Sequence, residues 1–76
     1  MIMNKKKLIL LNDNVNSFDG VILALMEVCG YNIYQAEQCA LIVHNTGKCI
    51  IKEGFIEELD KWRGELKRMG LKIKIE

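Results

Sequence analysis

The sequence contains no proline and only five aromatic residues, and its longest uninterrupted apolar run, Val21–Met26, has six residues. A transmembrane helix needs about 20 apolar residues, so we predict no membrane span. Without proline, the boundaries of helices and strands depend on glycine and on clusters of asparagine and aspartate. With 76 residues, half of them hydrophobic, the chain can bury one modest core, which predicts a single small domain.

Cysteine is also scarce. Cys29, Cys39 and Cys49 are odd in number, and no two of them form a C-x-x-C pair. This spacing indicates neither a disulfide framework nor a zinc site, so we predict that the three residues are small members of the core. We expect no metal and no other cofactor.

The net charge is only +1, but the charges are unevenly distributed. Residues 8–60 carry two lysines against eight carboxylates, whereas residues 61–75 carry six basic residues against Glu65. An acidic middle segment favours a cationic ligand over a phosphate backbone.

The lysines at positions 5–7 precede only four apolar residues without a cleavage site, so we predict no signal peptide and expect the protein in the cytoplasm.

Apolar periodicity and capping residues predict six elements. Ile56, Leu59, Trp62, Leu66 and Met69 recur at helical spacing, and residues 71–75 alternate as in a strand with one buried face. Asn16 or Ser17 is a candidate cap for the first helix, Asn32 with Gln35 resembles a capping box, and Gly30, Gly47 and Gly70 are candidate helix ends. The predicted strands are 6–11, 48–52 and 71–75, and the predicted helices are 17–29, 32–46 and 55–69.

The order β-α-α-β-α-β predicts an α+β fold, with a three-stranded antiparallel sheet and three helices packed on one of its faces. We expect residues 1–7 to be a short basic arm and residues 8–76 to be the single domain.

The most informative motif is a buried strand that runs directly into an amide-rich turn, Leu8–Leu11 followed by Asn12, Asp13 and Asn14. Alone, such a turn is an ordinary helix-entry signal, and the single histidine, His44, is an ordinary helix C-terminal residue. Together they offer several hydrogen-bond acceptors. A protonated α-amino group presents three donors, so a turn and a neutral imidazole of this kind are suited to bind it.

In order and spacing, "LILLND" at residues 8–13, "VH" at 43–44 and "GK" at 47–48 resemble the ClpS family, bacterial adaptors that recognise N-degrons and deliver them to a AAA+ protease. The resemblance covers nearly all of the chain from Leu8 to Glu76. It implies a non-enzymatic, monomeric adaptor whose ligands are peptides with Phe, Leu, Trp or Tyr first, and whose partner is an ATPase of the ClpA or ClpC type.

The resemblance also implies roles for individual residues. The residues expected to bind the α-amino group are Asn12, Asp13, Asn14 and His44. The residues expected to form the hydrophobic pocket are Leu11, Asn16, Phe18, Val21, Ala40, Val43 and Leu71. On the third helix, Glu57 and Lys61 are expected to contact the ATPase. Asn14 stands where the family typically has a second aspartate, and Phe18 and Ala40 stand where methionines are common. Only about seven residues precede the first strand, where the family commonly has a longer extension for delivery.

Three alternatives belong to other classes. A protein-interaction domain like the C-terminal domain of the ribosomal stalk protein has a similar layout of helices and strands, but needs no histidine beside an Asn/Asp turn. Nucleic-acid binding would rest on basic residues near the C-terminus, Lys61, Arg63, Lys67, Arg68, Lys72 and Lys74; the near-neutral charge and the missing aromatic sheet face argue against it. A hydrolase built from His44, Asp13 and a cysteine lacks any recognisable nucleophile-base spacing.

Overall fold

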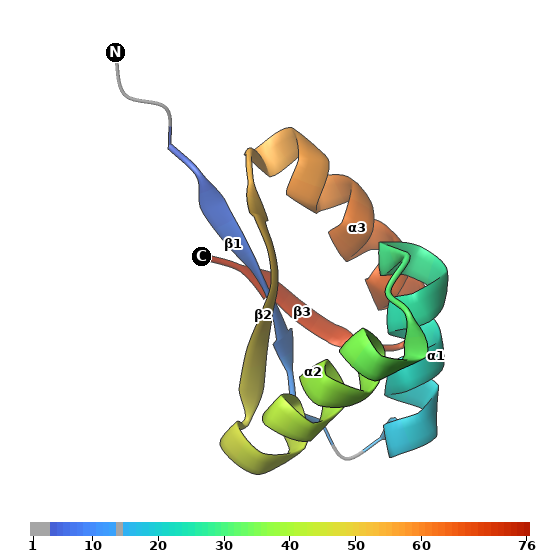
Figure 1. The fold of residues 1–76 in the computed structure, drawn as a ribbon. Helices are drawn as coiled ribbons and strands as arrows, with labels where there is room; N and C mark the ends of the chain where they lie inside the picture. The colour runs from blue at the N-terminus through green and yellow to red at the C-terminus, as the bar shows by residue number, and fades with distance from the viewer. Residues whose placement is uncertain (1–3, 14) are drawn as a thin grey trace.

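The structure is a computed structural model that describes residues 4–13 and 15–76 (Figure 1). It contains three strands and three helices in the predicted order β-α-α-β-α-β. The elements are β1 (Lys6–Leu11), α1 (Phe18–Cys29), α2 (Ile33–Thr46), β2 (Lys48–Gly54), α3 (Ile56–Arg68) and β3 (Lys72–Ile75). The predicted α+β class is confirmed.

The sheet is antiparallel throughout, with the strand order β2-β1-β3. The central strand β1 is the most apolar, and its Leu8 and Leu10 are fully buried. β2 is longer than the predicted 48–52, because Glu53 and Gly54 continue the pairing opposite Lys7 and Lys6. β1 therefore includes the last two lysines of the predicted basic arm.

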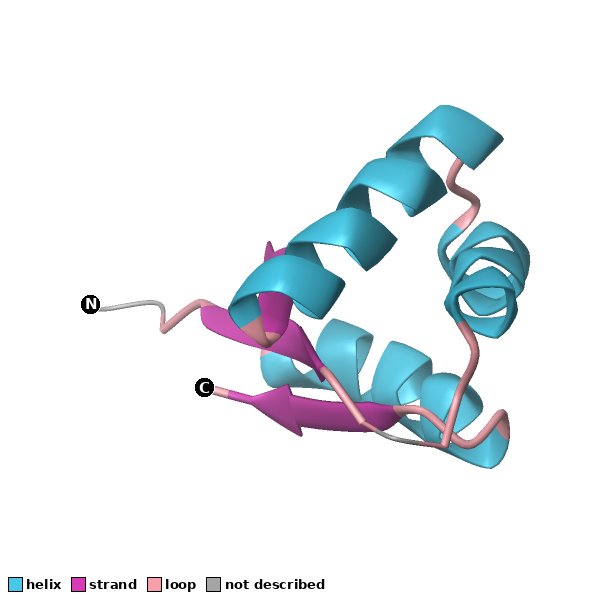
Figure 2. Ribbon diagram, turned by 90° about the horizontal axis from the view of Figure 1, so that it is seen from below, coloured by secondary structure: helices cyan, strands magenta, loops and turns pink. Residues whose placement is uncertain are grey.

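The three helices lie on the same side of the sheet, and the core fills the space between them and the strands (Figures 1 and 2). Leu25 of α1 and Leu59 and Leu66 of α3 are fully buried beside Leu8 and Leu10. From α2 the core receives only small side chains: Ala36, Cys39, Ala40 and Val43. α2 can therefore pack close to its neighbours, and it forms a wall of the cavity described below.

Local hydrogen bonds fix the helix ends at the residues that the sequence indicated. Asn32 and Gln35 form a reciprocal capping box at the start of α2, with distances of 2.8 and 3.1 Å between side-chain oxygen and backbone nitrogen. Gly47 ends α2 with a φ of 91°, in the left-handed region that glycine adopts most readily. Of the two candidate caps of α1, Ser17 is the actual cap, and its Oγ accepts from the Gly20 N–H at 3.0 Å.

Among the described residues, no helix combines the length and the apolar character that a membrane span requires.

Candidate functional site

A cavity of about 420 Å³ opens where the end of β1, the start of α1 and the second half of α2 meet. Its lining residues are Asn12, Asp13, Asn16, Ser17, Phe18, Val21, Ala40, Val43 and His44. Ligand pockets in proteins typically measure about 300–1,000 Å³, so this one suits a small ligand or a single large side chain. One side of the cavity is polar and the other is apolar.

The polar side is formed by two segments that are far apart in the sequence. The backbone N–H of Asn12 donates to the carbonyl oxygen of Gly47 at 2.9 Å, which joins the end of β1 to the turn that follows α2. This bond brings Asn12 next to the last turn of α2, where His44 is exposed. Asn12 and His44 therefore both line the same cavity.

Asp13 organises the turn between β1 and α1. Its Oδ1 accepts from the backbone N–H groups of Val15 and Asn16, both at 2.8 Å, and its Oδ2 accepts from the side-chain amide of Asn16 at 3.1 Å. The same amide nitrogen donates to the Gly70 carbonyl oxygen at 2.7 Å, which ties the turn to the segment before β3. Asp13 is thus a structural residue of this turn as well as a lining residue of the cavity.

These bonds also determine the charge state of Asp13. The hydrogen bond from the backbone of Asn16 is the largest influence that holds the pKa of the Asp13 carboxyl below its ordinary value of 3.8, aided by Lys72. The carboxylate is therefore ionised at neutral pH. Among the described residues that line the cavity, none is a lysine or an arginine, so its polar side, called the rim below, offers acceptors and a negative charge. Lys72, which lowers the pKa of Asp13, lines a neighbouring hollow that shares Asn12 and Asp13 with the cavity.

Replacing Asp13 with alanine should lower the free energy of unfolding at neutral pH by about 1 kcal/mol, because three hydrogen bonds of the turn are lost. Since folding lowers the pKa of Asp13, its contribution is present above the ordinary pKa of 3.8 and is lost as the pH falls through the lowered value. Urea titrations of both proteins at neutral pH and at about pH 2 measure the difference. A stability difference that does not shrink in acid would contradict this account, and Asp13→Asn separates loss of charge from loss of the acceptor.

The apolar side of the cavity comes from α1 and α2. Ala40 and Val43 are 3% and 4% exposed and form its floor, and the half-buried Val21 lies beside them. Phe18, the first residue of α1, is 39% exposed and contributes a ring to the wall. The small side chain of Ala40 leaves room at the floor, whereas Phe18 is positioned to pack against a ligand that enters.

Most of the predicted site residues lie around this cavity, but some do not. Leu11 and Leu71 are not among its lining residues; Leu11 is half-buried at the end of β1, and Leu71 is part of the core at 5% exposure. Asn14 lies outside the described residues. Glu57 and Lys61 are exposed on α3 and belong to a different surface.

Ser17 lines the cavity and was not predicted to do so, although it was a candidate cap. Its place follows from the capping role itself, because the cap of α1 is next to Phe18 at the mouth of the cavity. Among the described residues, no group of three or more His, Cys, Asp or Glu side chains is arranged to hold a metal ion.

Fold and cavity together define a small α+β binding domain whose cavity has an apolar floor and a rim of hydrogen-bond acceptors. The family described as ATP-dependent Clp protease adaptor protein ClpS matches residues 3–74, and the chain belongs to this family. This match supports the ClpS family over the alternative with a similar layout, the C-terminal domain of the ribosomal stalk protein. Among curated proteins, none matches the chain.

A solved structure shares the fold. The structure of Agrobacterium tumefaciens ClpS2 bound to L-phenylalaninamide superimposes with a TM-score of 0.90, covering 95% of this chain and 94% of that one at 18% sequence identity. At this identity the likeness concerns the arrangement of the elements, and the side chains of the site must be judged on their own chemistry.

Proposed function

We propose that the protein is an N-degron adaptor: it binds the free α-amino group and the bulky hydrophobic first residue of a substrate and delivers that substrate to a AAA+ Clp protease in the cytoplasm. It acts by recognition and performs no chemistry itself. The observation that carries the proposal is the pairing, in one cavity, of an acceptor-rich rim with an apolar floor.

The rim suits an ammonium group. An α-amino group with an ordinary pKa of about 7.7–8.0 is mostly protonated at neutral pH and must satisfy three donors. The amide oxygen of Asn12 and a ring nitrogen of His44 are the proposed acceptors, and the ionised Asp13 supplies negative charge nearby. We propose Asn14 as a further acceptor from the same turn. An acetylated N-terminus has neither the charge nor the three donors, so this rim discriminates against it.

The floor suits a large apolar side chain. An aromatic side chain buries about 150–250 Å², which at about 25 cal/mol per Å² corresponds to roughly 4–6 kcal/mol before the costs of association. Part of this is offset by lost translational and rotational freedom, so we expect dissociation constants on the order of micromolar. The small Ala40 leaves room at the floor of the cavity, and Phe18 stands on its wall. This shape supports a preference among peptides whose first residue is Phe, Tyr, Trp or Leu.

The test is a titration with short peptides that begin with Phe, Tyr, Trp or Leu and carry a dye at the other end, read by fluorescence anisotropy. Each peptide is compared with its N-acetylated form and with a peptide that begins with glycine. We expect the free amine to bind at least about 10-fold more tightly than the acetylated form, as expected for hydrogen bonds to a charged group. Equal affinity for free and acetylated peptides would rule out N-degron recognition.

Delivery is proposed to use a separate surface on α3. Glu57 and Lys61 are both exposed and one helical turn apart, so they present neighbouring charges to a ClpA- or ClpC-type ATPase. The beginning of α3 and the beginning of α1 lie at opposite ends of the molecule (Figure 1), so a bound substrate leaves this surface accessible. We propose that the adaptor works as a monomer.

Reversing both charges, with Glu57→Lys and Lys61→Glu, should weaken binding to the ATPase by about fivefold, as for exposed charge pairs, and leave peptide affinity unchanged. Degradation of a reporter that begins with phenylalanine, measured with purified ATPase and protease, reports delivery. The control is Glu37→Lys on α2, which reverses another exposed carboxylate. An equal loss in this control would mean that delivery responds to a charge reversal anywhere on the surface and does not depend on α3.

A further inference from the structure

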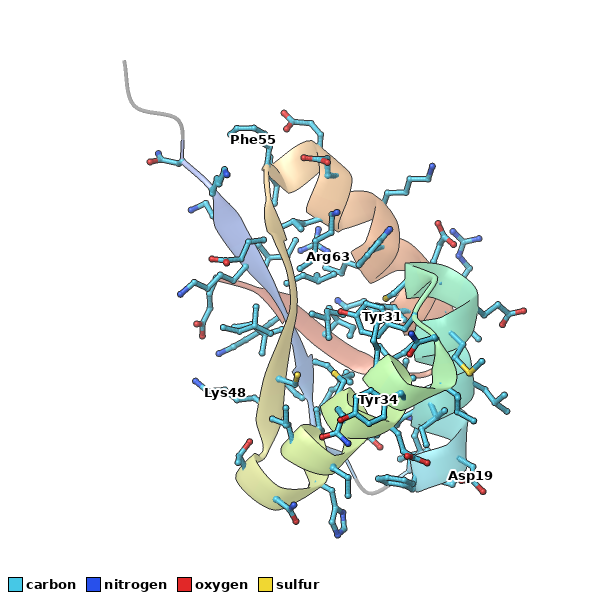
Figure 3. All side chains as sticks on the ribbon, in the orientation of Figure 1. Asp19, Tyr31, Tyr34, Lys48, Phe55 and Arg63 are labelled. Atoms are coloured by element: carbon cyan, nitrogen blue, oxygen red, sulfur yellow. The ribbon has the colours of Figure 1, made fainter. Side chains whose placement is uncertain are left out.

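A second hollow, of about 330 Å³, lies on the other side of α2, between that helix and β2. Tyr31 and Tyr34 line it (Figure 3), and so do Cys39 and Cys49. The hydroxyl of Tyr31 donates to the carbonyl oxygen of Ile51 at 2.7 Å, which holds the start of α2 against β2. The hollow shares no lining residue with the cavity around His44.

Two thiols meet in this hollow. The Sγ atoms of Cys39, in the middle of α2, and Cys49, the second residue of β2, are 3.0 Å apart, and both cysteines are free. The sulfur atoms of a disulfide are about 2.05 Å apart, so an approach of about 1 Å suffices to join them. The sequence separation of ten residues gave no indication of this pair, because the turn at Gly47 brings the strand back along the helix.

The two thiols differ in exposure. Cys39 is 4% exposed, and burial is the largest cause that raises the pKa of its thiol. Cys49 is only half-buried, so it is the thiol that a small reagent reaches first. Cys29, the third cysteine, lies at the end of α1 and does not line the hollow; burial raises the pKa of its thiol to about 11.

We propose that Cys39 and Cys49 are an oxidative modification site that forms a reversible intramolecular disulfide with a hydroperoxide as the oxidant. The Cys49 sulfur attacks the outer peroxide oxygen and becomes a sulfenic acid, while the O–O bond breaks and releases water, or an alcohol from an organic hydroperoxide. The Cys39 sulfur then attacks the sulfenic sulfur, the S–O bond breaks, and water leaves. The pair loses two electrons and two protons, and the peroxide is reduced.

Reversibility agrees with an intracellular protein, in which disulfides are typically transient and linked to redox sensing. The bond would connect α2 directly to β2. α2 also carries Ala40, Val43 and His44, so oxidation stiffens the helix that forms one wall of the other cavity. The site itself does not depend on peptide binding, and its test is independent of the proposed function.

The test treats the native protein with hydrogen peroxide, blocks remaining thiols with N-ethylmaleimide and maps the product by mass spectrometry. Cleavage with trypsin and with a protease that cuts after glutamate places Cys29, Cys39 and Cys49 on separate peptides, residues 28–37, 38–48 and 49–52. We expect a linked pair of the second and third peptides, the loss of two of the three alkylatable thiols, and their recovery with dithiothreitol. Cys29→Ser should form the same link, and Cys49→Ser should not form it.

Some results would overturn the proposal. One is a disulfide that involves Cys29. The other is oxidation of Cys49 to sulfinic acid while Cys39 can still be alkylated.

Thermal melting provides a second readout that needs no variant. A disulfide between two thiols that are already close together in the fold should raise Tm by roughly 10 °C, because it closes a loop in the unfolded chain. A lower Tm in the oxidised protein would show that the bond forms only by distorting the fold.

Discussion

Replacing Ala40 with phenylalanine should weaken binding of peptides that begin with a bulky residue by about 100-fold or more. Ala40 is 3% exposed and lies at the floor of the cavity, so a ring at this position occupies the space proposed for the first side chain of the ligand. Losing the burial of about 150 Å² of apolar surface corresponds to roughly 4 kcal/mol, which exceeds a 100-fold change in affinity.

Two comparisons make this experiment specific. Leu41→Phe introduces the same ring at the next position of α2, where the side chain is 39% exposed and does not line the cavity, and it should bind peptides normally. Thermal melting of each variant separates a blocked pocket from a damaged core, because overpacking costs about 1–3 kcal/mol. If Ala40→Phe stays folded and retains the affinity of the parent protein, the first side chain does not enter this cavity.

Replacing His44 with alanine should weaken binding of a free N-terminus by about 10-fold to 100-fold. This range corresponds to one hydrogen bond to a charged group, worth about 1.5–3 kcal/mol. Acetylated peptides, which lack the ammonium group, should be insensitive to the change. Asn12→Ala, which removes another proposed acceptor that lines the same cavity, should have a similar effect, and the double variant measures whether the two acceptors act on the same group.

A glutamine at position 44 gives an independent measure of the same role. Glutamine keeps a side-chain acceptor that alanine lacks, so His44→Gln should bind a free N-terminus more tightly than His44→Ala. Equal affinities of the two variants for free N-termini would exclude a hydrogen-bond acceptor at this position.

The elements of the fold could be predicted from the sequence because their signals are local. Asn32 and Gln35 form the capping box that their spacing of three residues indicated, and Gly47 ends α2 with the left-handed backbone that favours glycine. The apolar spacing from Ile56 to Leu66 placed α3, whose Leu59 and Leu66 are fully buried. Periodicity and capping depend on neighbours within about one helical turn, so the residues themselves contain this information.

The exact ends of the strands and helices, and the hydrogen-bond partners at those ends, were harder to predict from the sequence. The sequence ended the second strand at residue 52, yet β2 continues to Gly54, because two residues of β1 are available to pair with its end. Asn16 and Ser17 were equal candidates for the cap of α1. Ser17 takes that role because the amide of Asn16 is bonded to Asp13 and to the distant Gly70.

The sequence by itself determined the class of fold, the order of its elements and a turn of acceptors that follows a buried strand. Only the tertiary structure decided which side chains share a cavity. The bond between Asn12 and Gly47 brings His44 to that turn, Leu71 lies in the core and is not among the residues that line the cavity, and the thiols of Cys39 and Cys49 meet between α2 and β2. The physical reason is the same in each case: these contacts join residues far apart in the chain, and local propensity cannot encode how separate elements pack.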